Sequence, residues 1–61
     1  MNIQTAVQKA QLFLKKKSIK TPVLDSQILM SEAIKKDKEF IIFNFDKEVS
    51  NKSLEYFNKL I

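Results

Sequence analysis

The sequence predicts a small all-α bundle of four short helices, with room for a fifth helix in any chain that follows Ile61. It contains no glycine and a single proline, so it lacks the turn residues that β-hairpins favour. Apolar residues recur every three to four positions in separate segments, which is the period of an amphipathic helix. At 61 residues, 44% apolar and 30% charged, the chain has the composition of one folded domain spanning residues 1–61.

The first helix is predicted over residues 3–17. Its apolar residues form one stripe at helical spacing, which consists of Ile3, Ala6, Val7, Ala10, Phe13 and Leu14. Leu12 lies outside this stripe, so we expect it to be exposed or to make a second contact. Ile19, in the short connection that follows, is expected to fill the core between helices.

The second helix is predicted from Thr21 to about Lys36. Threonine is a favourable N-cap, and Pro22 suits the first helical position because an N–H there has no partner within the helix. The apolar face consists of Leu24, Ile28, Leu29 and Ile34, widened by Met30 and Ala33. A face this wide is typical of a helix that packs among several others.

Two shorter helices are predicted in the second half. Asp37 is a candidate N-cap for a helix from Lys38 to about Asn44; a strand in its place would have no partner strand. Ser50 is a candidate N-cap for the last helix, whose apolar stripe continues to the final residue and so predicts a piece of a longer protein. The predicted core consists of Ile3, Val7, Ala10, Leu14, Leu24, Ile28, Leu29, Ile41, Leu54 and Phe57.

The composition argues against catalysis by these residues. The absence of cysteine and histidine removes the thiol nucleophile, the commonest general base and the commonest metal ligand. The absence of glycine removes any glycine-rich loop for a phosphate or nucleotide. The seven acidic residues do not have the spacing of a calcium-binding loop. We therefore expect no catalytic, cofactor-binding or metal-binding residue here, no membrane span and a cytoplasmic location.

Positive charge gathers in the first half of the chain. The net charge is +4, and residues 32–61 contribute none of it because their six lysines balance six acids. Four lysines cluster at the end of the first helix and in the turn after it: Lys15, Lys16, Lys17 and Lys20. One interpretation is a solvated helix end, where cations complement the helix dipole. The other is a contact with an acidic partner, RNA or a phosphate.

Three segments share a pattern with a known family. Residues 21–30 read Thr-Pro-Val-Leu-Asp-Ser-Gln-Ile-Leu-Met, residues 36–42 read Lys-Asp-Lys-Glu-Phe-Ile-Ile, and residues 49–61 begin Val-Ser and end Phe-Asn-Lys-Leu-Ile. In order and spacing they resemble the N-terminal domain of HemK/PrmC-type methyltransferases. These enzymes modify the glutamine of the Gly-Gly-Gln motif in peptide chain release factors. A difference is Lys35-Lys36, where the family often has glycine.

The resemblance implies a non-catalytic domain that helps to dock the release factor. The family's S-adenosylmethionine loop and its Asn-Pro-Pro-Tyr motif have no counterpart in these residues, so the catalytic domain and the cofactor would belong to the rest of a longer protein. The implied partners are the release factor and that catalytic domain, with no membrane and no direct nucleic acid. The four clustered lysines are then candidate partner-binding residues. The alternative is a stand-alone helical interaction or nucleic-acid-binding module, which the length of the source gene would distinguish.

Overall fold

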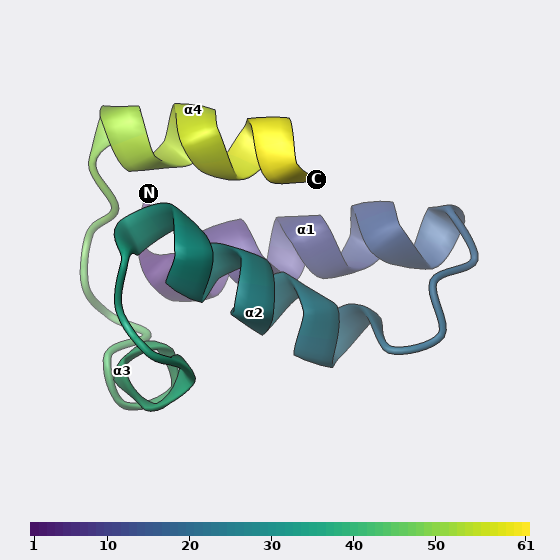
Figure 1. Ribbon diagram of the computed structural model, residues 1–61, viewed down its shortest axis with the longest axis horizontal. Helices are drawn as coiled ribbons and strands as arrows, with labels where there is room; N and C mark the ends of the chain where they lie inside the picture. Colours follow the sequence, from purple (N-terminus) through teal and green to yellow (C-terminus); the bar gives the residue numbers. More distant parts are fainter.

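The computed structural model describes all of residues 1–61, and it confirms a small all-α bundle. The helices are α1 (Ile3–Lys16), α2 (Pro22–Ile34), α3 (Lys38–Phe43) and α4 (Asn51–Leu60). The first two form an antiparallel pair, and α4 runs in the same general direction as α1 (Figure 1). The short α3 lies beside the C-terminal end of α2 and is seen end-on in this view (Figure 1). None of the helices has the length and apolar character that a membrane span requires.

Helix α2 is the central element, as its wide apolar face predicts, because it packs against each of the other three helices. The buried side of α2 differs from the predicted one. Ser26 and Met30 are fully buried, whereas Leu24 and Ile28, both predicted as core, are 41% and 48% exposed. Apolar residues occur all round this helix, so their periodicity does not select one face. The side that packs inward carries the small Ser26 and Ala33 together with the adaptable Met30.

The core lies where α2 meets the other helices. Its buried cluster consists of Ile3, Ala6, Val7, Ala10, Met30, Ala33, Ile41, Val49 and Phe57. Leu14, also predicted as core, is buried nearer to the end of α1. Leu29 and Leu54 are half-buried and pack against the cluster. The predicted core residues of α1, α3 and α4 are therefore confirmed. Phe13, predicted on the stripe of α1, is 44% exposed, and the other errors lie in α2 and the connection before it.

Side-chain caps define the starts of three helices. Asp37 and Ser50 act as predicted, each accepting the backbone N–H three residues later, at 2.9 and 3.2 Å. Asn2, which was not predicted, caps α1 in the same way at 2.8 Å. Thr21 does not cap α2 with its side chain; its hydroxyl donates to the carboxylate of Asp25 at 3.1 Å.

The loop between α3 and α4 lies along the start of the chain. The backbone N–H of Val49 donates to the carbonyl oxygen of Met1 at 3.0 Å, and Asn2 and Glu48 form an isolated antiparallel bridge. The α-amino group of Met1 also pairs with the Glu48 carboxylate at 2.8 Å. These contacts bring the N-terminus of α4 beside the N-terminus of α1 (Figure 1).

Candidate docking surfaces

Helix α1 ends in a tight left-handed turn that is made without glycine. Ser18 adopts a φ of 62°, its N–H donates to the carbonyl of Lys15, and the N–H of Ile19 donates to the carbonyl of Leu14, both at 3.1 Å. These two bonds are those of a Schellman motif. They hold the chain after α1 against the last turn of that helix. Ile19 is therefore kept at the surface and is 37% exposed, so the prediction that it fills the core was wrong.

A shallow depression of about 400 Å³ lies between the last turns of α1 and the first turn of α2. We call it the basic depression; its lining residues are Gln11, Leu12, Lys15, Ile19, Lys20, Pro22 and Val23. Leu12 is 64% exposed and Val23 is 53% exposed, so two aliphatic side chains face solvent at one place. The exposure of Leu12 confirms that it lies off the buried stripe.

The structure divides the four clustered lysines between two places. Lys15 and Lys20 line the basic depression. Lys16 is exposed on α1 one helical turn after Leu12, which places it beside the same aliphatic side chain. Lys17 lies elsewhere, with its Nζ 4.7 Å from the centre of the Phe13 ring in a cation–π contact. The sequence cluster is thus three lysines near the depression and one beside Phe13.

The positive charge at this end of the molecule has no acidic partner within the chain. The only ion pair joins Met1 to Glu48 at the opposite end of α1, so none of the four lysines is paired with a carboxylate. Asp25, the nearest acid in sequence, accepts the hydroxyl of Thr21 instead. The lysines are consequently available to carboxylates or phosphates of another molecule.

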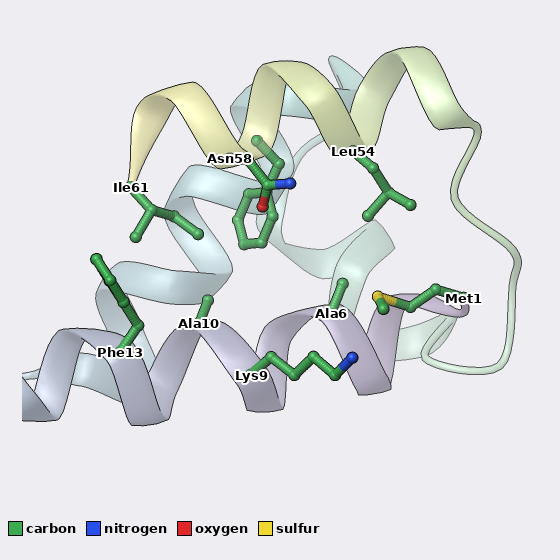
Figure 2. Close-up of a pocket in the computed structure, with 9 residues that line it drawn as sticks. Met1, Ala6, Lys9, Ala10, Phe13, Leu54, Asn58 and Ile61 are labelled. Atoms are coloured by element: carbon green, nitrogen blue, oxygen red, sulfur yellow. The ribbon is translucent and has the colours of Figure 1, made fainter.

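A second concave surface, the apolar groove, runs between α1 and α4 and has a volume of about 410 Å³ (Figure 2). It is lined by Met1, Ala6, Lys9, Ala10, Phe13, Leu54, Phe57, Asn58 and Ile61. Figure 2 shows Phe13 of α1 and Ile61 approaching each other at one end. Sequence reasoning missed this groove, because it depends on the spacing of two helices that both pack on α2.

Neither concave surface has the features of a reactive site. No three acidic side chains gather where they could hold a metal ion. Every buried polar side-chain atom has a hydrogen-bond partner, so none is left directed towards a small ligand. The buried hydroxyl of Ser26, for example, donates to the carbonyl of Val23 at 2.8 Å. What the two surfaces offer chemically is contact area and, at the basic depression, positive charge.

Comparison with known proteins identifies one family. The family model described as the PrmC N-terminal domain matches residues 5–61. The match includes all of α2, α3 and α4, most of α1 and all four clustered lysines. No curated protein and no solved structure matches the chain.

Proposed function

The chain belongs to the PrmC N-terminal domain family, and on this premise we propose that it recognises a peptide chain release factor for a methyltransferase of that family. In this proposal the chemistry belongs to a catalytic domain outside these residues. That domain transfers the methyl group of S-adenosylmethionine to the glutamine of the Gly-Gly-Gln motif. The helical domain contacts both the release factor and its own catalytic domain, and it acts in the cytoplasm, where release factors work.

The observation that carries the proposal is the unpaired positive charge beside exposed aliphatic side chains. Lys15 and Lys20 have no intramolecular carboxylate and line the depression together with Leu12, and Lys16 is exposed one helical turn after Leu12. Protein interfaces combine apolar contact area with complementary charge at the rim. Single exposed aliphatic residues are ordinary on a protein surface, whereas here Leu12, Ile19 and Val23 share one concavity with two unpaired lysines.

Charge and apolar area contribute differently to such a complex. An exposed ion pair contributes only about 0.2–1 kcal/mol, and salt screens it. The lysines therefore act mainly on the rate and orientation of encounter, and apolar burial contributes most of the affinity. Binding of the release factor should accordingly weaken, but persist, as ionic strength rises.

Calorimetric titration of the purified chain with the release factor from the same source tests the proposal. We expect saturable binding that weakens with salt. The double reversal Lys15→Glu with Lys16→Glu should weaken binding at low salt, by about 5- to 30-fold if two exposed pairs become repulsive. The matched control reverses Lys52 and Lys59 on α4, which are also exposed and change the net charge equally.

Two results would contradict the proposal. One is the absence of binding at low ionic strength, where electrostatic attraction is strongest. The other is equal weakening by the two double reversals, which would show a response to net charge and no defined surface. Tighter binding of an RNA probe than of the release factor would favour the alternative of a nucleic-acid-binding module.

A further inference from the structure

We infer that the basic depression receives an aliphatic side chain from an acidic segment of the partner protein, with carboxylates of that segment meeting Lys15 and Lys20. The inference rests on the proposed function, since the partner protein is the release factor. It goes further by naming the chemistry of the segment and the residues that receive it.

The shape and lining of the depression suit one aliphatic anchor. Leu12, Ile19 and Val23 come from α1, the connection and α2, and all three are exposed at the same concavity. Its volume of about 400 Å³ leaves room for an aliphatic side chain to enter it. Burying these aliphatic surfaces against another aliphatic group is favourable because it removes them from water.

The charge at the rim specifies what must flank that anchor. Lys15, in the last turn of α1, and Lys20, in the connection that follows, both line the depression, and neither has a carboxylate partner. Lys16 adds a third positive charge next to Leu12. A segment with aspartate or glutamate beside its aliphatic residue is complementary to this arrangement, whereas a basic segment would be repelled.

The depression is already formed before a partner arrives. The Schellman bonds of Ser18 and Ile19 to α1 fix the connection, and Pro22 begins α2 with a restricted backbone. The partner therefore orders little of this surface on binding, so less of the interaction free energy is lost to conformational entropy. This rigidity matches a site that selects a short segment by its side chains.

The lining of the depression favours a protein segment over a nucleic acid. Single-stranded nucleic acids bind through bases stacked on aromatic rings and through phosphates. None of the seven lining residues is aromatic, and the three aliphatic side chains offer nothing to a phosphate. Phe13 of α1 lies in a cation–π contact with Lys17 and lines the apolar groove, not the depression.

Three double variants of the chain test the inference by calorimetry against the release factor at low and at near-physiological ionic strength. Leu12→Ser with Val23→Ser removes aliphatic surface at exposed positions, so the fold should persist, and we expect about tenfold weaker binding at both ionic strengths. Lys15→Glu with Lys20→Glu should weaken binding strongly at low salt and less at high salt. Lys52→Glu with Lys59→Glu is the control of equal charge change.

A crosslinking measurement identifies the segment directly. With a photoreactive benzoylphenylalanine in place of Val23, irradiation of the complex should label a release-factor peptide that contains aliphatic residues next to aspartate or glutamate. Labelling of a basic peptide would overturn the inference, as would unchanged affinity in both the serine and the glutamate variants. In those cases the release factor still binds, so the proposed function stands.

Two further outcomes distinguish the proposed function from the inference about the depression. Failure of the wild-type chain to bind the release factor overturns the proposed function and the inference together. The other outcome uses a single-stranded oligouridine probe. If the chain binds this probe, if Lys15→Glu with Lys20→Glu abolishes the binding, and if Leu12→Ser with Val23→Ser leaves it intact, the depression binds phosphates. That result would overturn the inference alone.

Discussion

The backbone N–H of Ile3, in the first turn of α1, donates to the carbonyl oxygen of Lys47 at 2.9 Å. The next N–H, that of Gln4, donates in the same way to Phe45 at 2.9 Å. The first N–H groups of a helix have no partner within it. Here two of them donate to carbonyl oxygens of a loop that lies more than forty residues later in the chain. This pairing joins the start of α1 to the loop that leads into α4, at the end of the bundle where both helices begin.

Asn2 accepts a third N–H at the start of α1, and removing its side chain should lower the stability of the domain measurably. Its side chain accepts the N–H of Thr5 at 2.8 Å. We expect Asn2→Ala to reduce the free energy of unfolding by about 0.5–2 kcal/mol. Asn51→Ala, at an exposed position of α4 with no capping bond, is the control and should change it little. Equal stability of the two variants in urea denaturation would contradict the capping role.

The left-handed turn after α2 predicts a stabilising substitution. Lys35 has a φ of 58°, and the N–H groups of Lys35 and Lys36 donate to the carbonyls of Glu32 and Ser31 in a second Schellman motif. A non-glycine residue in this conformation costs roughly 1–2 kcal/mol. Lys35→Gly should therefore raise the free energy of unfolding by roughly 1 kcal/mol, which corresponds to about 4–8 °C in Tm.

The control for that substitution is the next residue. Lys36 does not have a positive φ, so Lys36→Gly should destabilise the domain slightly by making the unfolded chain more flexible. A lower Tm for both glycine variants would show that the turn conformation carries no cost.

The buried side of α2 predicts losses of stability of different size for alanine substitutions at neighbouring residues. Met30 is fully buried in the core cluster, so Met30→Ala should cost about 2–5 kcal/mol, enough to unfold most of a domain this small. Leu29→Ala should cost less, because Leu29 is only half-buried. Ile28→Ala removes a largely exposed side chain and should cost about 1 kcal/mol or less. Thermal melting that gives the reverse order would mean that α2 buries its other side.

The lysine cluster leads to a kinetic prediction for the complete methyltransferase. Under the proposed function, reversing Lys16 and Lys17 to glutamate should raise the KM for the release factor and leave kcat near its normal value, because methyl transfer would take place in another domain. The effect should shrink as salt rises, since exposed charges are screened over about 8–10 Å at physiological ionic strength. Steady-state kinetics at two ionic strengths measure it. An unchanged KM at low salt would indicate that Lys16 and Lys17 form only a solvated helix end and do not contact the release factor.

The isolated chain should not bind S-adenosylmethionine. It has no glycine with which to build a glycine-rich loop around the cofactor, and its concave surfaces are apolar or lysine-lined. Calorimetric titration of the chain with the cofactor should give no heat of binding. Binding in the micromolar range would contradict this and would place part of the cofactor site in the helical domain.

Features that depend on residues close together in the chain were predictable from the sequence. The stripe of α1, the caps Asp37 and Ser50, and the helix-starting Pro22 act through contacts within a few positions, so the sequence contains all of their determinants. The four helices, the all-α class and the lysine cluster at the end of α1 follow from such local patterns. The family resemblance also rests on them, because it depends on the order and spacing of these segments.

What only the tertiary structure decided depends on contacts between distant segments. The side of α2 that is buried was not predictable, because apolar residues surround this helix and the choice between Met30 and Ile28 is made by the fit against α1, α3 and α4. The basic depression likewise exists because the left-handed turn at Ser18 brings Ile19 and Lys20 back beside α1. Sequence alone places four lysines in one short stretch. Helical geometry and that turn decide which of them share a surface with exposed aliphatic side chains, since neighbours in sequence point in different directions from a helix.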